Sequence, residues 1–436
     1  LFVKIQDNDG LLQLYIKRDE ICPDEDKSYW EHLTKNGMDL GDIIGATGYV
    51  FITKTGETSV HASTVTLLAK SLKPLPVVKR DEDGHVFDAV TDPEFRYRQR
   101  YADLIINPDV KDTFAKRTVL MTTIREFLNS RGALEVDTPV LQAIPGGAAA
   151  RPFATHHNAL DVPFYLRIAN ELYLKRLIVG GFDWVYEFSR NFRNEGMDRT
   201  HNPEFTVLEW YTAYKDYYWM MEITETLFEK IAMTLHGKTE LTVGDTTINF
   251  KAPYRRISII EAIQENTGID ITGMDEAALR GVCMQLNIDV PPTIGKGKLI
   301  DEIFGATSES KYIQPTFIID YPIEMSPLTK KHRTKEGLVE RFELMVNGKE
   351  LANAYSELND PIDQRKRFED QLSLMERGDD EAMFIDHDFL RALEYGMPPT
   401  SGIGIGIDRL CMMMLNQPSI QDVLLFPQMR PEKFID

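Results

Sequence analysis

Residues 184–211 constrain the fold of this chain most strongly, because two runs with strand periodicity flank a short polar segment there. Alternation in the second run places four side chains on one face: Phe205, Val207, Glu209 and Tyr211. The first run likewise aligns Glu187, Ser189, Asn191 and Arg193. The segment between them carries Arg193, Glu195, Arg199 and His201, and the planar donors of arginine suit phosphate oxygens. An ordinary hairpin with a charged tip is the alternative that this stretch alone leaves open.

A second informative stretch is the acidic hairpin at 341–360. Asn347-Gly348 predicts a two-residue turn, which makes Glu343 and Glu350 diagonal neighbours on one face. Two carboxylates that close repel each other unless a cation lies between them, and magnesium prefers oxygen ligands. Simple alternation places Asn353 and Glu357 on the face opposite Glu350. A bulge near residues 351–352 would bring all of them to one pocket.

The first 70 residues read as short strands, with Asp9-Gly10 as a hairpin turn. One predicted face is apolar and comprises Val3, Ile5, Leu12, Leu14 and Ile16. The other mixes aromatic, amide and lysine side chains, namely Phe2, Lys4, Gln6, Gln13, Tyr15 and Lys17. Such a mixture suits single-stranded RNA, whose bases stack on rings and bond to amides, although a solvated sheet face has the same composition.

Several helices follow from capping and periodicity. We expect an amphipathic helix from an N-cap at Asp112 to a stop at Gly132, and another that begins near Glu171. A third helix is expected at residues 216–235. Ser258 and Glu261 have the spacing of a capping box that begins a further helix. The segment 236–312 reads as an inserted helical subdomain. The small residues at 146–153 let backbone approach a ligand, and Gly402, Gly404 and Gly406 precede Asp408-Arg409 and a helix.

Length and composition limit the class of protein. A chain of 436 residues exceeds one hydrophobic core, so two domains are expected, with a boundary near 73–85. A net charge of −19 disfavours a general nucleic-acid binder but leaves local basic patches possible. The three cysteines, Cys22, Cys283 and Cys411, predict reduced structural thiols and neither a disulfide framework nor a zinc site. With neither a membrane-length apolar run nor a signal peptide, we expect a cytoplasmic protein. Because Leu1 opens directly into strand-like sequence, we also expect the natural chain to begin earlier.

Three ordered motifs resemble those of the class II aminoacyl-tRNA synthetases, in the form that lysyl-tRNA synthetases of subclass IIb carry. FRNEGMDRTHNPEF at 192–205 is similar to motif 2, GIGIGIDRL at 402–410 to motif 3, and the run from Phe127 to Pro139 to motif 1. The resemblance covers nearly the whole chain and is of the eukaryotic-like type. It implies an α+β protein, in which an N-terminal β-barrel of the OB-fold type precedes a catalytic domain. That catalytic domain is built on a mainly antiparallel sheet flanked by helices. The implied domains are residues 1–72 for anticodon binding, 73–110 as a connector and 111–436 for catalysis.

The resemblance also assigns site residues. For ATP it implies Arg193, Asn194, Glu195, His201, Asn202, Phe205, Glu343, Glu350, Leu351, Gly406, Asp408 and Arg409, with Arg193 and Arg409 as the catalytic pair. For substrate lysine it implies Gly147, Glu171, Arg193, Glu209, Tyr211, Asn353, Tyr355 and Glu357. Glu343 and Glu350 would hold Mg²⁺ as the cofactor. Phe2, Gln13 and Tyr15 would bind the anticodon of tRNA(Lys), and motif 1 would form a homodimer interface.

The implied reaction is activation of lysine with ATP to lysyl-adenylate, followed by transfer to the 3′ end of tRNA. Three alternatives stay open at this point. An aspartyl or asparaginyl synthetase is disfavoured, because an aspartate pocket needs cations where this chain has Glu171, Glu209 and Glu357. A non-catalytic, synthetase-like RNA-binding protein is disfavoured by the intact Arg193 and Arg409. Lysylation of a protein is disfavoured by the N-terminal module.

Overall fold

The computed structural model describes residues 1–76, 79–80, 86–87, 90–148, 150–376 and 383–432. These residues form two compact units, Leu1–Pro108 and Asp109–Asp436. Much of the charged run that the sequence marks as a domain boundary, and Ala149 of the small-residue loop, lie outside the described residues. Contacts within each unit place the division at residue 108. The segment after residue 90, which the sequence predicts as a connector, belongs to the first unit.

The first unit is built on a four-stranded sheet with the order β1-β2-β4-β3. Its elements are β1 (Phe2–Gln6), β2 (Leu11–Ile16), α1 (Arg18–Ile21), α2 (Ser28–Glu31), η1 (His32–Gly37), β3 (Ile43–Ile52), β4 (Thr58–Ala69), β5 (Lys79–Arg80), β6 (Val86–Phe87), α3 (Pro93–Arg98) and α4 (Arg100–Ile106). The predicted strand-rich module is present. Among the described residues, however, the sheet is open, with β1 and β3 at its edges, and does not close into a barrel.

The first hairpin differs from its prediction in one respect. Asp7 donates its backbone N–H to the carbonyl of Gly10 over 3.0 Å, so the turn spans four residues and not two. Phe2 consequently pairs with Tyr15, and the register is shifted by two residues. A shift of two leaves every side chain on its predicted face. Leu14 and Ile16 lie in the core of this unit, while Phe2 is 57% exposed.

The second unit is organised by an eight-stranded sheet, ordered β15-β16-β17-β18-β19-β12-β11-β7. Its strands are β7 (Leu134–Glu135), β11 (Trp184–Phe192), β12 (Glu204–Ala213), β15 (Arg255–Ser258), β16 (Thr316–Ile319), β17 (Arg341–Val346), β18 (Lys349–Ser356) and β19 (Thr400–Gly406). All pairs are antiparallel except β11 with β7 and β15 with β16 at the edges. The predicted mainly antiparallel sheet is confirmed.

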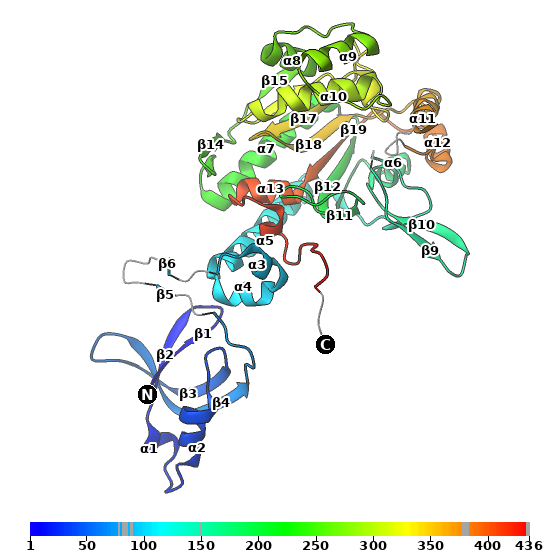
Figure 1. Ribbon diagram of the computed structural model, residues 1–436. Helices are drawn as coiled ribbons and strands as arrows, with labels where there is room; N and C mark the ends of the chain where they lie inside the picture. The colour runs from blue at the N-terminus through cyan, green and yellow to red at the C-terminus, as the bar shows by residue number, and fades with distance from the viewer. Residues whose placement is uncertain (77–78, 81–85, 88–89, 149, 377–382, 433–436) are drawn as a thin grey trace. The chain divides into compact units, whose positions relative to one another are not determined.

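Helices flank this sheet (Figure 1). They are α5 (Pro108–Asn129), α6 (Glu171–Val179), α7 (Tyr217–His236), α8 (Ile259–Thr267), α9 (Glu276–Gln285), α10 (Lys296–Thr307), α11 (Pro361–Glu376), α12 (His387–Glu394), α13 (Ile407–Met414) and α14 (Ile420–Val423). Short 3₁₀ helices and minor strands complete the described part of this unit: β8 (Leu141–Gln142), β9 (Ala154–His157), β10 (Val162–Leu166), β13 (Glu240–Val243), β14 (Thr246–Asn249), η2 (Glu309–Lys311) and η3 (Ile323–Met325). In Figure 1, α8, α9 and α10 lie together, α11 and α12 lie near α6, and the β9–β10 hairpin extends outward.

The two faces of the central strands have different partners, as strand alternation requires. Leu208, Trp210 and Ile405 are fully buried in the largest hydrophobic core, together with residues of α5, α7 and α13. Phe205, Glu209 and Tyr211 project from the opposite face of β12. The predicted alternation is therefore confirmed, and it separates a dry core from a polar face.

Two helical predictions need correction. The motif 1 helix begins at Pro108 and not at Asp112, because proline suits the first helical position and its fixed φ starts the helix one turn earlier. The segment 236–312 contains α8, α9 and α10 but also the β13–β14 hairpin and β15, an edge strand of the main sheet. Short strands without a clear alternation carry too little periodicity to be predicted from the sequence. The capping box of Ser258 and Glu261 is confirmed.

A core substitution tests this architecture. Ile405 is fully buried on the central strand β19, so Ile405→Ala should remove about 2–4 kcal/mol of unfolding free energy and lower the urea midpoint of the second unit. Ile362→Ala is the matched control, because Ile362 is 82% exposed and its loss should change stability by less than about 0.5 kcal/mol. Equal midpoints for the two variants would contradict the described core.

Candidate active site

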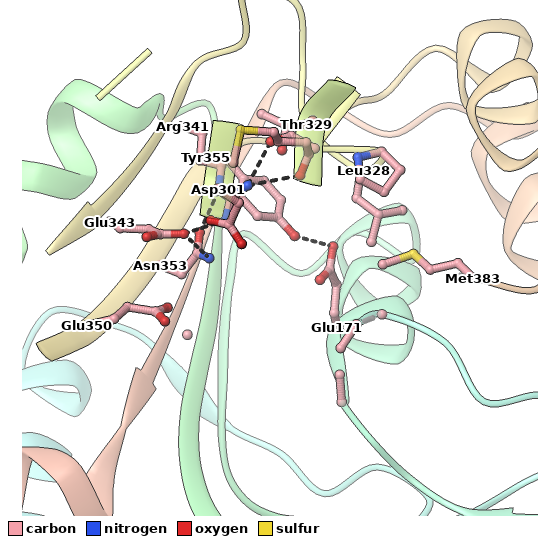
Figure 2. Close-up of a pocket in the computed structure, with 18 of the residues that line it drawn as sticks. Glu171, Asp301, Leu328, Thr329, Arg341, Glu343, Glu350, Asn353, Tyr355 and Met383 are labelled. Carbon is pink, nitrogen blue, oxygen red and sulfur yellow. Dashed lines mark hydrogen bonds and ion pairs between the residues drawn. The ribbon is translucent and has the colours of Figure 1, made fainter. Parts of the chain in front are cut away.

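A cavity of about 1370 Å³ lies over the polar face of the central sheet. Side chains from the strands β12, β17, β18 and β19 line one side of it, and residues of the helices α6, α10 and α11 line its periphery. Figure 2 shows part of this lining, in which Glu343, Glu350 and Asn353 come from the acidic hairpin and Glu171 faces them across the cavity. Segments that are remote in sequence are thus brought to one site.

One part of the cavity is cationic. Arg193, at the end of β11, lies over the ring of Phe205 with 5.1 Å between the guanidinium carbon and the ring centre. Its buried Nε has no hydrogen-bond partner among the described residues. Burial lowers the pKa of Arg193, and the nearby charge of Glu195 opposes that effect. A buried guanidinium with an unused donor is suited to a phosphate or carboxylate oxygen.

Arg409 and His201 form a hydrogen-bonded pair beside Arg193. Nη2 of Arg409 lies 3.0 Å from Nε2 of His201, and Nδ1 of His201 lies 2.8 Å from Oδ2 of Asp198. Since arginine only donates, Nε2 must accept and Nδ1 must carry the proton. Asp198 also accepts the backbone N–H groups of Thr200 and His201, which fixes the loop between β11 and β12.

Asp408 is held differently from its neighbours. It is 2% exposed, its Oδ1 lies 2.7 Å from Nη2 of Arg117, and its Oδ2 accepts the N–H of Thr206 over 2.8 Å. Both oxygens are therefore used within the protein, although the residue borders the cavity. This network joins α5, β12 and the β19–α13 junction, and it fixes the start of the helix that carries Arg409.

The acidic hairpin contains the bulge that the sequence predicts near residues 351–352. Met345 pairs with Glu350 and Leu344 pairs with Ala352, so Leu351 is the extra residue. Asn347 and Gly348 have φ values of 52° and 65°, as their predicted two-residue turn demands. The bulge places Glu350, Asn353 and Tyr355 along the cavity, whereas strict alternation would have separated Glu350 from the other two.

The two hairpin carboxylates differ in their surroundings. Oε1 of Glu343 accepts from Nη2 of Arg341 over 2.5 Å and from Nδ2 of Asn353 over 3.4 Å. Burial, followed by the charge of Glu350, raises the pKa of Glu343 to about 8. Side-chain exposure of Glu350 is 38%, it borders the cavity, and its Oε2 lies 3.8 Å from Nη1 of Arg409. A cation shared by the two would relieve their repulsion.

The opposite part of the cavity is lined by buried acids and phenols. Glu209 is 7% exposed and accepts a hydrogen bond of 3.0 Å from the Tyr211 hydroxyl. Burial, reinforced by the charge of Glu171, raises the pKa of Glu209 to about 8. The Tyr355 hydroxyl donates to Oε1 of Glu171 over 2.7 Å, as Figure 2 shows. Uncompensated carboxylates in such a place favour a cationic ligand.

Gly402 explains how Glu357 reaches this region. A Cβ at position 402 would collide with Oε1 of Glu357 and with the ring of Tyr211. Glu357 is 1% exposed, and its Oε1 has no hydrogen-bond partner in the described part of the chain. Burial raises the pKa of Glu357 well above its usual value, and Lys175 opposes that effect. The glycine therefore lets a buried acid lie directly against β19.

Sequence patterns did not single out three residues that belong to this region. Lys175 on α6 is fully buried and forms ion pairs with both Glu171 and Glu357. Arg341 bonds Glu343 and Asn353, and Asp301 of α10 borders the cavity near them. Periodicity does not distinguish Lys175 from an ordinary helical lysine. One available signal was its place one turn after Glu171 on the same helix.

Most of the residues assigned from the resemblance line this one cavity: Gly147, Glu171, Arg193, Glu195, His201, Asn202, Phe205, Glu209, Tyr211, Glu343, Glu350, Leu351, Asn353, Tyr355, Gly406, Asp408 and Arg409. Two do not border it. Glu357 lies buried behind Gly402, and Asn194 bonds through its backbone N–H to the carbonyl of Arg151. Phe2, Gln13 and Tyr15 belong to the other unit.

The first unit presents an aromatic face of its own. The rings of Phe2 and Tyr15 lie 5.0 Å apart between centres, and Tyr15 lies 4.9 Å from His61. Tyr49 and Phe51 of β3 extend this group, and neither was singled out from the sequence. Nε2 of Gln13 bonds to Oγ of Ser59 over 2.9 Å at the side of the group. Five rings on one exposed sheet face provide a surface on which bases can stack.

Within the described residues no group of three or more acidic, histidine or cysteine side chains is arranged to hold a metal ion by itself. The three cysteines are reduced and buried, as predicted. Among the described helices, none has the length and apolar character needed to cross a bilayer.

Comparison with known proteins agrees with this geometry. Residues 92–430 match the family model described as tRNA synthetases class II (D, K and N). A protein of Porphyromonas gingivalis (strain ATCC 33277), named lysine–tRNA ligase, is 68% identical over 99% of this chain and 75% of its own length. Proteins of the same name from Azobacteroides pseudotrichonymphae and Christiangramia forsetii are 66% and 64% identical over 99% of this chain, and 86% and 76% of their lengths are covered. With its three motifs gathered around one cavity, the chain belongs to the class II tRNA synthetases, in the branch that these lysine–tRNA ligases represent.

Proposed function

We propose that this chain is a lysine–tRNA ligase that activates lysine with ATP and transfers it to the 3′ end of tRNA(Lys). The observation that carries the proposal is the polarity of the cavity. Arg193, His201 and Arg409 line one part, and Glu171 and Glu209 line the other, where Glu357 lies buried behind Gly402. A triphosphate and a diamino acid have the complementary charges.

In the first step, the carboxylate oxygen of lysine forms a bond to the α-phosphorus of ATP while the bond to the bridging oxygen breaks, and pyrophosphate leaves. In the second step, the terminal ribose hydroxyl of tRNA forms an ester with the lysyl carbonyl, and AMP leaves. Neither step needs a protein nucleophile. The work of the protein is to position the reactants and to stabilise charge.

The cationic residues have the roles that charge stabilisation requires. Arg193 binds the α-phosphate and the attacking carboxylate, since its unused Nε donor lies in a buried setting. Arg409 and His201 bind the outer phosphates, and the ring of Phe205 stacks on adenine with Asn202 and Glu195 beside it. Asp198 bonds to His201, and Asp408, through Arg117 and Thr206, fixes the start of the helix that carries Arg409.

Mg²⁺ fits the acidic hairpin. Glu350 is close enough to contribute to the raised pKa of Glu343, and Oε2 of Glu343 is not among the atoms that Arg341 and Asn353 bond. Magnesium usually combines one or two carboxylates with phosphate oxygens, so two protein ligands suffice. When bound, the ion neutralises charge on the phosphates of ATP.

Specificity for lysine follows from the acidic part of the cavity. Glu209, Tyr211 and Glu357 receive the side-chain ammonium, while Glu171 and the backbone near Gly147 receive the α-amino group. A neutral side chain would leave buried acids unpaired, and an aspartate side chain would add a further negative charge. These surroundings disfavour the aspartyl and asparaginyl alternatives.

We also propose a homodimer through motif 1. Apolar side chains of and around that motif are exposed on the single chain: Val119, Leu134, Val140, Leu141 and Ile144. An isologous interface would bury them. Sedimentation equilibrium should give twice the chain mass for the native protein and a lower mass for Leu141→Asp, while Ile362→Asp, exposed on α11, should stay dimeric. A monomeric native protein would refute the interface.

The first unit supplies the tRNA specificity in this proposal. Its aromatic face stacks anticodon bases, and Gln13 beside it reads a base edge. The activity belongs to the cytoplasm, where ATP and tRNA are both available.

Exchange of labelled pyrophosphate into ATP tests the proposed activity directly. The purified chain is given ATP, magnesium and the amino acids one at a time. Exchange should depend on lysine and on magnesium. Exchange with aspartate or asparagine would reassign the pocket, and a folded protein without any exchange would favour a non-catalytic RNA-binding role.

Glu357→Gln tests the side-chain pocket. The amide keeps the shape of the acid but removes its charge, so kcat/KM for lysine should fall about a hundredfold or more while KM for ATP changes by less than about twofold. Glu222→Gln, exposed on α7, is the matched control and should leave both constants unchanged. Equal losses for lysine and ATP would reject the assignment.

Glu209 makes lysine binding dependent on pH. Burial raises its pKa to about 8, so the free protein holds this acid neutral below that pH and charged above it. A bound ammonium favours the charged form, and lysine binding near pH 7 should therefore release a proton and strengthen as pH rises toward about 8.5. Calorimetry in two buffers of different ionisation enthalpy counts this proton. Glu209→Gln should abolish the release; unchanged release would assign the proton to another group.

Gln13→Ala separates the two units. It should reduce kcat/KM for tRNA about tenfold or more, because one base contact is lost, and leave lysine-dependent exchange intact. Gln264→Ala, exposed on α8, serves as the control. Impaired exchange in Gln13→Ala would contradict the division of labour between the units.

A further inference from the structure

Lys175 is the most deeply buried cation beside the cavity. Its side chain is completely enclosed, on α6, one helical turn after Glu171. Burial of an ammonium group is costly unless acids compensate it. Here two acids from remote parts of the chain meet it, and neither the resemblance nor the proposed roles of the pocket residues include it.

The contacts of Lys175 divide the oxygens of its two partners. Its Nζ lies 2.5 Å from Oε1 of Glu171 and forms an ion pair with Oε2 of Glu357. Oε1 of Glu171 is also bonded by the Tyr355 hydroxyl, and its Oε2 is not bonded by any described residue. Oε1 of Glu357 likewise has no hydrogen-bond partner in the described part of the chain. Each acid thus has one oxygen tied to Lys175 and one left over.

The groups around Lys175 come from four elements. Glu171 belongs to α6, Glu209 and Tyr211 to β12, and Tyr355 to β18, and Glu357 follows that strand. The ring of Phe389 on α12 lies 5.8 Å from Nζ, while Asp386 and Asp388 of that region pair with Arg176 instead. The cluster therefore holds three acids and one internal cation.

We infer that Lys175 is a positioning residue for the amino-acid substrate: a built-in cation that holds one oxygen of Glu171 and one oxygen of Glu357, so that the second oxygen of each stays available to the two ammonium groups of lysine. The inference rests on the proposed function. Burial and the charges of Glu171 and Glu209 raise the pKa of Glu357, and Lys175 opposes that rise. Lys175 thus supplies compensating charge without occupying the oxygens that the substrate uses.

The geometry predicts a pH-dependent defect once the internal cation is removed. In Lys175→Met both acids lose their ion-pair partner, and Glu357 also loses the charge that opposes its raised pKa, so it takes up a proton more readily. KM for lysine should rise about tenfold or more at pH 7 relative to the wild type, with KM for ATP within about twofold. The ratio of variant to wild-type KM should shrink as pH rises from about 6.5 to 8.5, because a higher pH favours the charged form of Glu357.

The experiment compares three variants in lysine-dependent pyrophosphate exchange. Lys175→Arg retains a cation and should keep the ratio of KM values independent of pH, whatever its size. Lys230→Met, exposed on α7, makes the same chemical change away from the cavity and should match the wild type. A ratio for Lys175→Met that does not vary with pH, or equal losses for lysine and ATP, would overturn the inference and leave Lys175 a structural residue.

Chemical rescue decides the case in which Lys175→Met fails to fold. Lys175→Ala leaves a space that ethylammonium can enter, so exchange activity should rise with ethylammonium concentration, whereas wild-type activity should not. Absence of rescue would overturn the inference. Failure of the proposed function has a different signature, because the wild-type chain itself would then show no exchange with lysine.

Discussion

The burial of several carboxylates on one face of a sheet is the constraint on which the rest of this structure depends. Glu187, Glu209 and Glu357 are all nearly inaccessible to solvent, and a protein interior penalises the charged form of each. Glu187 is compensated by Arg167 at 2.7 Å and Glu357 by Lys175. Glu209 has a bonded tyrosine but, among the described residues, no bonded cation, and burial and the charge of Glu171 raise its pKa. The site is therefore built to be completed by a cationic ligand.

Strand alternation made much of this arrangement predictable. The alternation in β12 assigns Phe205, Glu209 and Tyr211 to one face without any knowledge of their partners, and the Asn347-Gly348 turn sets the register of the acidic hairpin. The conflict over Asn353 predicted a bulge, and Leu351 is that bulge. In the first hairpin the turn length was wrong, yet the faces were right, because a shift of two residues preserves alternation.

What the sequence could not predict depends on contacts between remote segments. Lys175 and Glu357 are separated by almost two hundred positions, and no periodicity connects them. The same holds for Arg117 and Asp408, and for the rings of Tyr49 and Phe51 that join Phe2 and Tyr15. Strand alternation predicted only the face of the sheet on which each residue lies. The ligand that each residue would bind was inferred from the resemblance to a family.

Strand β19 links the two parts of the cavity through the spacing of its glycines. At Gly402 the absence of a Cβ admits Glu357 and Tyr211 to the strand, so this glycine serves the acidic part. Gly404 has ordinary contacts only, with its nearest neighbour at 3.7 Å, and a small side chain there meets no comparable obstacle. At the far end of the same strand, Gly406 precedes α13, which carries Arg409 toward His201. The glycines of β19 thus serve two different purposes. The missing side chain of Gly402 makes room for the acidic residues of the amino-acid pocket, and the helix that follows Gly406 positions Arg409 for phosphate binding.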